Sequence, residues 1–314
     1  MAKCPFFGMC GGCKYDFNAP EYHAQKSETL PKIDNMHEPV WGAPGTRRRA
    51  DFVAAPNHFG FYKTGTRDIV DITKCPNILP EINDILPNLA RLPWGGVASV
   101  LVTLCKNGIV VNVTSDVPYF GPEFRDAVQK LPSQIIRFTW NNSVIRKYHA
   151  PQIEFDNIVV DFPDGAFLQP TTDTEKTLRD LVVDTVAGKK HIADLFCGIG
   201  NFTFATNATG FDIMGTGTNR DLFKKPLTTA QLNQYDAVIM DPPRAGAMAQ
   251  SKELAKSDVP TVVYISCNPG TWTRDKNILV RGGYTLKTVI PVDQFVGTAH
   301  WEVFSVFVKN TQKH

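Results

Sequence analysis

The sequence lacks several features, and each absence excludes a class of protein. No apolar run in the 314 residues approaches the ~20 that a membrane helix needs. The N-terminus has no apolar signal-peptide core, and the chain has no repeats and no low-complexity segment. Acidic and basic residues nearly balance, at 31 and 33, which excludes a histone-like binder but allows a local basic patch. We expect a cytoplasmic, monomeric protein with no membrane contact.

The residues that are present predict an ordinary globular chain. The hydrophobic fraction is 43% and the mean hydropathy is −0.17, so a sizeable core can be buried. The length is that of about two domains. Seven cysteines occur without an export signal, so metal binding or catalysis is favoured over a disulfide framework.

The pattern of apolar residues divides the chain into three parts: residues 1–45, 46–165 and 166–314. Residues 46–165 contain short apolar runs between Gly, Pro, Asn and Asp, which predicts a small β-rich domain. From residue 166, apolar runs alternate with helical pieces, which predicts a doubly wound, mainly parallel α/β sheet. The expected strands are Arg49–Ala54, Gly60–Lys63, Ser99–Thr103, Ile109–Thr114, Ile135–Thr139, Ile158–Phe162, His191–Phe196, Asp236–Met240, Val259–Ile265, Thr285–Val292 and Trp301–Val308. The expected helices are Pro20–Thr29, Thr174–Val186 and a stretch Leu79–Leu92 that Pro87 would break.

Four of the cysteines suggest a metal site. Cys4, Cys10 and Cys13 lie close together at the N-terminus, and Cys75 follows before a proline. Glycines between them let the backbone curl around a metal, and four thiolates suit zinc or an iron–sulfur cluster. The spacing does not decide between the two. Unrelated buried thiols are the plainer alternative.

The first chemical motif, Asp194-Leu-Phe-Cys-Gly198-Ile-Gly200, closes an apolar strand. Two glycines one residue apart let a ligand approach the backbone closely. The third glycine of a dinucleotide fingerprint is missing, which disfavours NAD. An acid followed by Gly-x-Gly at a strand end is typical of S-adenosylmethionine (SAM) methyltransferases. A tight strand-to-helix turn without a ligand is the alternative.

The second motif, Asp241-Pro-Pro-Arg244-Ala-Gly246, ends the strand Asp236–Met240. Two prolines fix the backbone beyond the strand and hold Asp241 at the rim of the sheet. Methyltransferases that act on exocyclic nitrogens often carry an aromatic residue in place of Arg244, so amino-group chemistry is disfavoured. A plain Pro-Pro turn is the alternative.

Two further motifs lie at strand ends of the same sheet. Cys267, in Ser-Cys-Asn-Pro, would point into the crevice of the first two motifs, where a thiolate can act as a nucleophile. Glu302, in His300-Trp301-Glu302, can act as a general base. A buried structural cysteine and a surface glutamate are the alternatives.

Together these motifs resemble the RNA uracil-5-methyltransferase family, which forms 5-methyluridine. The resemblance covers nearly the whole chain. Its signatures occur in order as Gly60-Phe-Tyr, Phe167-Leu-Gln169, Asp-Leu-Phe-Cys-Gly, Asp-Pro-Pro-Arg-Ala-Gly, Ser-Cys-Asn and His-Trp-Glu. The family implies a Rossmann-like SAM-dependent methyltransferase domain beside a small β-rich RNA-binding domain and an N-terminal iron–sulfur segment. The cysteine quartet resembles the members that act on 23S rRNA, and the tRNA member generally lacks it.

The resemblance implies roles for individual residues. Cys267 is the nucleophile that adds to carbon 6 of uracil, and Glu302 is the base that removes the carbon-5 proton. Asp241 and Gln169 contact the substrate. The SAM contacts implied are Gln169, Asp194, Phe196, Gly198, Gly200, Asp212, Asp221 and Asp241. The [4Fe-4S] ligands implied are Cys4, Cys10, Cys13 and Cys75.

The sequence departs from the family between Gly200 and Asp241. Only residues 201–240 lie between them, which is short for the usual helix, second strand, helix and third strand. We therefore expect a shortened domain with a reduced SAM site, in which Asp212 lies in a loop across a deletion. Two alternatives to 23S rRNA methylation follow: an RNA-binding relic with weak SAM binding, and a tRNA T-loop methyltransferase.

One segment suggests how RNA is held. Arg47, Arg48 and Arg49, with Lys63 and Arg67, outnumber the acids of residues 46–68 and would bind phosphates. The aromatic residues among them, which could stack on bases, are Phe52, Phe59, Phe61 and Tyr62. A solvated edge with core aromatics is the alternative. Cys105 and Cys197 are expected to be buried thiols without a role.

Overall fold

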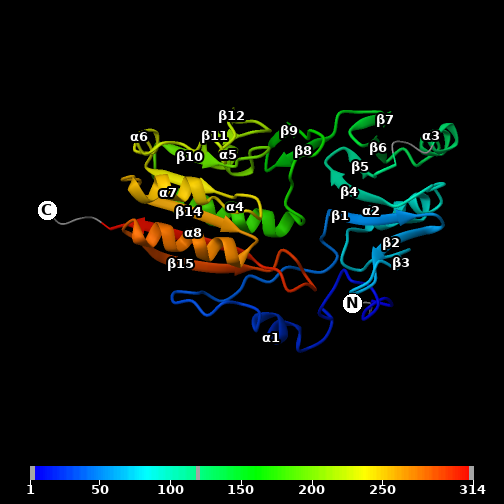
Figure 1. Ribbon diagram of the computed structural model, residues 1–314, viewed down its shortest axis with the longest axis horizontal. Coiled ribbons are helices and arrows are strands. Elements are labelled where there is room, and N and C mark those ends of the chain that lie inside the picture. Colours follow the sequence, from blue (N-terminus) through cyan, green and yellow to red (C-terminus); the bar gives the residue numbers. More distant parts are fainter. Residues whose placement is uncertain (1–3, 118–120, 311–314) are drawn as a thin grey trace. The chain divides into compact units, whose positions relative to one another are not determined.

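The structure is a computed structural model that describes residues 4–117 and 121–310 (Figure 1). The chain forms two compact units, each built from separate stretches of sequence. The first unit comprises Met1–Glu28, Ala43–Thr172 and Val296–Ala299. The second comprises Thr29–Gly42, Asp173–Phe295 and His300–His314. No helix in the described ranges is both long and apolar enough to cross a bilayer.

The first unit is built on a seven-stranded sheet of order β3-β2-β1-β4-β5-β6-β7 and a separate hairpin, β8-β9. All neighbours in the large sheet are antiparallel except β5 and β6. Its elements are α1 (Tyr22–Ser27), β1 (Arg49–Ala55), β2 (His58–Tyr62), β3 (Ile69–Asp71), α2 (Pro80–Ala90), β4 (Ala98–Cys105), β5 (Gly108–Thr114), α3 (Pro122–Gln129), β6 (Ile135–Trp140), β7 (Ser143–Lys147), β8 (Gln152–Phe155) and β9 (Ile158–Asp161).

Helix α2 continues through Pro87, which corrects the expectation of a break there. An interior proline costs about 3 kcal/mol of helix stability. The helix buries Ile82, Ile85, Leu86 and Leu89 in the core of the sheet. Burial of each such side chain contributes about 1.5–3 kcal/mol, so together they offset the proline.

The second unit is an α/β sheet of order β12-β11-β10-β13-β14-β16-β15. The neighbours from β12 to β14 are parallel, whereas β16 runs antiparallel to β14 and β15. The doubly wound prediction is confirmed. Its elements are α4 (Thr172–Val186), β10 (Ile192–Leu195), α5 (Asn201–Thr206), β11 (Thr209–Asp212), β12 (Thr218–Asn219), α6 (Thr229–Leu232), β13 (Ala237–Met240), α7 (Met248–Lys256), β14 (Thr261–Ser266), α8 (Pro269–Arg281), β15 (Tyr284–Val292) and β16 (Glu302–Lys309).

Helices cover both faces of this second sheet. Val238 and Met240 of β13 pack in one apolar cluster with α7 and α8, while Ala237 and Ile239 pack in another with α4 and α5. Since alternate strand residues point to opposite faces, the two clusters lie on opposite sides of the sheet. The strands are therefore buried on both faces, as their uninterrupted apolar sequences predict.

The stretch between Gly200 and Asp241 is abbreviated in the structure as well. It contains the six-residue helix α5, the four-residue strand β11, the two-residue strand β12 and the four-residue helix α6. Between β11 and β12, this fully described stretch has no helix. The strand order reverses between β10 and β13, and in such sheets ligands bind at this reversal, beyond the carboxyl ends of the strands.

Candidate active site

Cys267, Asp241 and Glu302 lie at one edge of the second sheet. Tyr264 pairs with Met240, so the parallel strands β13 and β14 end side by side. Ser266 pairs with Val303 across the antiparallel β14–β16 ladder, so β16 begins where β14 ends. The residue after Ser266 is Cys267, and the residue before Val303 is Glu302. Strand register therefore brings a thiol and two carboxyl groups together.

The environment of Cys267 opposes its ionisation. The pKa of this thiol is raised to about 11, mainly by burial and then by the negative charges of Glu302 and Asp241, while Arg244 opposes the rise. The free protein therefore holds a protonated thiol beside two acids. A base must take the thiol proton when the nucleophile is used.

Glu302 is buried, which excludes the surface alternative. Glu302 is 2% exposed. Its pKa is raised well above the ordinary value, mainly by burial and in smaller part by the charge of Asp241. Gln294 Nε2 donates to Glu302 Oε2 at 3.1 Å, and Gln294 Oε1 accepts from Thr174 Oγ1 at 3.2 Å. Glu302 Oε1 has no hydrogen-bond partner among the described residues. A buried carboxyl with one orphan oxygen and a raised pKa is suited to proton transfer.

Side chains of α8 hold the loop that follows Asp241. Asn268 Nδ2 and Thr271 Oγ1 both donate to the carbonyl of Arg244, at 3.0 and 3.2 Å. The amide of Ala247 and the hydroxyl of Tyr264 donate to the buried carboxylate Oδ2 of Asp275, both at 2.7 Å. The loop containing Asp241 is thus tied to the residue that follows Cys267.

The supporting side chains Gln294 and Asp275 were not singled out in the sequence. Each is an ordinary polar residue within or near a strand or helix, and its partners are distant along the chain. Their burial is the only unusual property, and burial is a result of folding.

The glycine turn after β10 has the backbone conformation expected for close approach. Gly198 and Gly200 have φ angles of +52° and +93°, a region that favours glycine. Asp194 lies beneath the turn and is fully buried, so its pKa rises to about 7 despite a 2.6 Å hydrogen bond from Thr203 Oγ1. Asp194 Oδ1 has no partner among the described residues.

Asp212 lies at the end of β11, not in a loop, which corrects the expectation for this residue. Parallel pairing of β11 with β10 places it beside the glycine turn, where its Oδ2 accepts from the Gly198 amide at 2.9 Å. The next segment folds over the turn: Thr216 donates its amide to the Gly198 carbonyl at 3.1 Å. A Cβ added at Gly215 would lie 1.9 Å from that carbonyl oxygen, so only glycine fits there.

The remaining predicted SAM contacts have different surroundings. The Lys224 ammonium lowers the pKa of Asp221, and hydrogen bonds from the amides of Lys224 and Phe223 lower it further. The Phe196 and Phe223 rings lie 5.4 Å apart between centroids, and Phe196 has a φ of +63°. Gln169 belongs to the first unit, where it is 4% exposed and its carbonyl accepts from Arg48 Nε.

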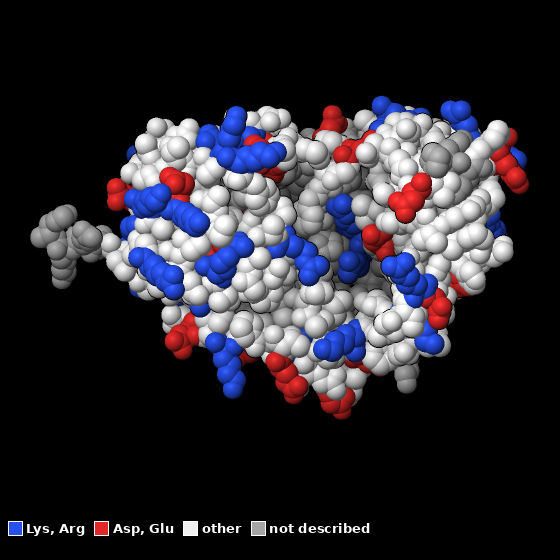
Figure 2. Space-filling model, viewed as in Figure 1, with Lys and Arg blue, Asp and Glu red and all other residues white. Residues whose placement is uncertain are grey.

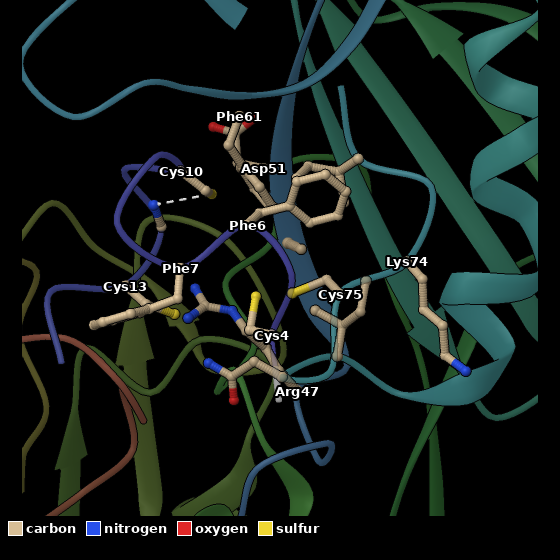
Figure 3. Close-up of a pocket in the computed structure, with 15 residues that line it drawn as sticks. Cys4, Phe6, Phe7, Cys10, Cys13, Arg47, Asp51, Phe61, Lys74 and Cys75 are labelled. Carbon is tan, nitrogen blue, oxygen red and sulfur yellow. Dashed lines mark hydrogen bonds between the residues drawn. The ribbon is translucent and has the colours of Figure 1, made fainter. Parts of the chain in front are cut away.

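The four N-terminal and central cysteines line one cavity of about 250 Å³ in the first unit (Figure 3). The pKa of Cys13 is raised to about 12 and that of Cys75 to about 11, mainly by burial and in smaller part by the charges of the neighbouring cysteines. The guanidinium of Arg47 lies between Cys13 and Cys4 in Figure 3 and lowers the pKa of Cys13 and Cys75.

The donor set of this cavity fits a thiolate-bound metal in its chemistry. Four thiols from two distant segments face one space, and a half-buried cation stands among them to offset their charge. Within residues 4–117 and 121–310, however, no three His, Cys, Asp or Glu side chains are arranged closely enough to hold a metal ion as they stand.

The arginine triplet is not an open phosphate-binding patch, which corrects the sequence interpretation. Arg48 is 5% exposed, and the three side chains donate to the carbonyls of Arg49, Gln169 and Ala166. Phe52 and Phe59 belong to the core. Of the predicted patch, Tyr62, Lys63 and Arg67 remain exposed. Cys105 and Cys197 are buried, as predicted.

Known proteins resemble this chain over most of its length. A family model described as tRNA (Uracil-5-)-methyltransferase matches residues 218–310. An RNA methyltransferase of Mesorhizobium japonicum is 34% identical over 98% of this chain and 84% of the relative. The 23S rRNA (uracil(1939)-C(5))-methyltransferase RlmD of an Enterobacter species is 26% identical over 97% of this chain and 81% of its own length.

A solved structure shares the fold over most of the chain. It is that of Pyrococcus abyssi tRNA (uracil-54, C5)-methyltransferase in complex with S-adenosyl-L-homocysteine, with a TM-score of 0.69 and 20% identity over 94% of this chain and 84% of that one. The match to the Mesorhizobium relative extends over 351 residues, more than the 314 of this chain, so that relative carries residues within the matched region that this chain lacks. Identity and coverage together establish that the chain belongs to the RNA uracil-5-methyltransferase family, whose members are SAM-dependent enzymes.

Proposed function

We propose that this protein transfers a methyl group from SAM to carbon 5 of a uridine in 23S rRNA, through a covalent adduct of Cys267. The observation that carries the proposal is the meeting of Cys267 and Glu302 at one sheet edge, with one carboxyl oxygen of Glu302 unpartnered among the described residues. Its RNA substrate would place the enzyme in the cytoplasm.

The chemistry requires a nucleophile and a separate base. Carbon 5 of uracil becomes nucleophilic only after Cys267 loses its thiol proton to solvent water and adds as a thiolate to carbon 6. SAM, when bound, supplies the electrophilic methyl group. Glu302 then accepts the carbon-5 proton, and the electron pair of that C–H bond restores the double bond as the Cys267 sulfur leaves. The raised pKa of Glu302 makes it a stronger proton acceptor than an ordinary glutamate.

The residues around the glycine turn are the candidates to hold SAM. Gly198 and Gly200 open the backbone, Phe196 offers an aromatic face, and Asp212 stands at the end of the second strand, where a carboxylate can accept from ribose hydroxyls. Gln169, Asp194, Asp221 and Asp241 complete the set that we propose. Asp241 and Gln169 would also contact the uracil.

The four cysteines support 23S rRNA over tRNA. They line one cavity together with Arg47, and we propose that they bind a [4Fe-4S] cluster with a structural role. A cluster would offset the repulsion among the thiolates, which adds to the effect of burial on their pKa values. The likeness to the Enterobacter enzyme, whose name specifies 23S rRNA, supports the same substrate.

Binding to RNA would use exposed basic side chains other than the arginine triplet. Figure 2 shows Lys and Arg dispersed over the face of the second unit that carries α7 and α8. The exposed members on and near these helices are Lys224, Lys225, Lys252, Lys256 and Arg281. The target uridine must leave its stack to reach the sheet edge, so we expect it in an unpaired loop.

One observation favours a second candidate function, that of an RNA-binding relic with weak or lost SAM binding. Residues Ile213–Gly217 lie against the glycine turn, and the Gly198 amide is already bonded to Asp212. Isothermal titration with SAM distinguishes the methyltransferase from the relic. The enzyme binds SAM at micromolar to millimolar concentration, whereas the relic does not bind SAM but still binds RNA.

The decisive experiment incubates the protein with methyl-labelled SAM and total RNA that lacks 5-methyluridine. We expect label at one uridine of 23S rRNA with the wild type. Label in the tRNA T-loop would establish the tRNA alternative. No label, with RNA still bound, would establish the relic.

A further inference from the structure

The loop Val296–Ala299 belongs to the first unit, although the residues before and after it belong to the second. It leads directly into Trp301 and Glu302. Between β15 and β16, both strands of the second sheet, the chain therefore contributes four residues to the unit that contains the four cysteines. Strand β16 then begins with Glu302, the proposed base. Whatever holds this loop also limits where β16 can begin.

Residues next to Cys13 hold the loop on one side. The amides of Lys14 and Tyr15 both donate to the Gly297 carbonyl, at 2.7 and 2.8 Å, and the Gly297 amide donates to the Tyr22 hydroxyl at 2.9 Å. Both hydrogen-bonding groups of the Gly297 backbone are therefore used by the segment that carries the N-terminal cysteines.

A residue next to Cys75 holds the loop on the other side. The buried side chain of Asn77 donates from Nδ2 to the Val296 carbonyl at 2.8 Å. The backbone amide of the same residue hydrogen-bonds the sulfur of Cys75. Asn77 thus links a cysteine of the cavity and the loop through two different groups.

Gly297 could not be replaced without displacing a cysteine. Its φ is +80°, which favours glycine. A Cβ at this position would lie 2.9 Å from Cys13 Sγ and 3.2 Å from Phe17 Cδ1. The loop therefore packs directly on the sulfur of one of the four cysteines.

We propose that Asn77 and Gly297 are positioning residues, which fasten the loop Val296–Ala299 to the two cysteine segments and thereby place Glu302 for removal of the carbon-5 proton. The proposal rests on the proposed function for its last step. It gives the cysteine cavity a task in the reaction other than redox chemistry. Only four residues separate Gly297 from Glu302, a reach of at most about 18 Å, and Glu302 is the first residue of β16, where the sheet holds the chain from the C-terminal side only.

The first test measures hydrogen exchange of the full-length protein. In Asn77→Ala, we expect the amides of Lys14, Tyr15 and Gly297 to exchange about fivefold faster than in the wild type, as for one lost buried hydrogen bond. The control Asn107→Ala loses a side-chain amide bond of the same length in the same unit, to the Ala150 carbonyl at 2.8 Å, but an exposed one, and it should leave the exchange of the three amides unchanged. Unchanged exchange of the three amides in Asn77→Ala would overturn the anchoring.

The second test measures the covalent complex of Cys267 with substrate RNA in denaturing gels during turnover. If proton removal is slower, Asn77→Ala and Gly297→Ala should accumulate the adduct severalfold above the wild-type level. We expect kcat to fall and KM to change little. Gly188→Ala, at φ +76° with open space around it, is the control for backbone strain alone.

The two tests separate the two proposals. Faster exchange with adduct at the wild-type level would confirm the anchor but overturn its positioning role. If the wild type itself forms no adduct and transfers no methyl group, the proposed function fails and the positioning role fails with it, while the exchange result still decides whether the loop is anchored.

Discussion

The protein has two sites where burial raises the pKa of a thiol, and the two sites differ in the charge of the neighbouring side chains. In the cysteine cavity, thiols stand beside the guanidinium of Arg47. At the edge of the second sheet, Cys267 stands beside the carboxyl groups of Glu302 and Asp241, with Arg244 as an opposing charge. Burial raises the thiol pKa values in both places, to about 12 for Cys13 and about 11 for Cys267.

On our proposal, this difference in neighbouring charge separates thiols that bind a metal from a thiol that acts as a nucleophile. Several thiolates in one cavity need positive charge to coexist, which a metal and Arg47 can supply. A single nucleophile beside carboxyl groups stays protonated and unreactive until a base takes its proton at the substrate. The predictions that follow test this contrast.

Removal of the reacting thiol should have the largest effect. In Cys267→Ala, we expect methyl transfer to fall by at least about 10⁴-fold and the covalent RNA adduct to vanish, because no other group adds to carbon 6. Cys105→Ala, which removes a buried thiol of the first unit, should keep both. The measurement is label transfer from SAM together with adduct on a denaturing gel. An active Cys267→Ala enzyme would refute the nucleophile assignment.

Loss of the base should be the next largest effect. Glu302→Gln keeps the shape and the bond to Gln294 but cannot accept a proton, so we expect turnover to fall by about 10²–10⁴-fold. Adduct should accumulate, since its formation precedes proton removal. Equal adduct in wild type and Glu302→Gln would contradict this assignment.

Removal of the cation from the cysteine cavity should weaken metal binding. For Arg47→Gln, we expect about tenfold less iron retained against a chelator after anaerobic reconstitution, because thiolate repulsion is no longer offset. Arg67→Gln, an exposed arginine of the same unit, is the matched control and should retain iron as wild type does. No iron bound by the wild type under these conditions would disprove the cluster proposal, and zinc content should then be measured.

The smallest expected effect concerns the ionisation of Cys267. With a thiol pKa of about 11, the thiolate fraction rises about tenfold per pH unit below that value. Asp241→Asn removes a repelling charge and lowers this pKa, so alkylation by iodoacetamide at pH 8 should quicken a fewfold. The exposed Asp184→Asn should not change it. Slower alkylation of Cys267 in Asp241→Asn would contradict our assignment that Asp241 raises the pKa of Cys267.

Strand positions and the order of motifs could be predicted from sequence. The expected strands Arg49–Ala54 and Ile109–Thr114 correspond to β1 and β5, because apolar runs between turn residues are local signals. Strand β7 and helix α3 were missed, since both are short and largely polar. Pro87 was overrated as a helix breaker because the burial of α2 cannot be read locally.

Local sequence was a poor guide to which charges are exposed. Arg48 and Glu302 are both buried, although arginine and glutamate are usually found at the surface. Each is accommodated by a group outside its own local sequence: the Gln169 carbonyl accepts from Arg48, 121 residues away, and Gln294 donates to Glu302 from the far end of the loop between β15 and β16. Such partners become neighbours only through strand pairing and chain crossing.

The sequence by itself determined the family and the doubly wound sheet, because these follow from residue type, spacing and short-range pattern. Only the tertiary structure decided that register joins Cys267 to Glu302, that Asp212 ends a strand, and that the loop before Glu302 is fastened to the cysteine segments. These are long-range relations, fixed by hydrogen-bond ladders and burial rather than by neighbours in the chain.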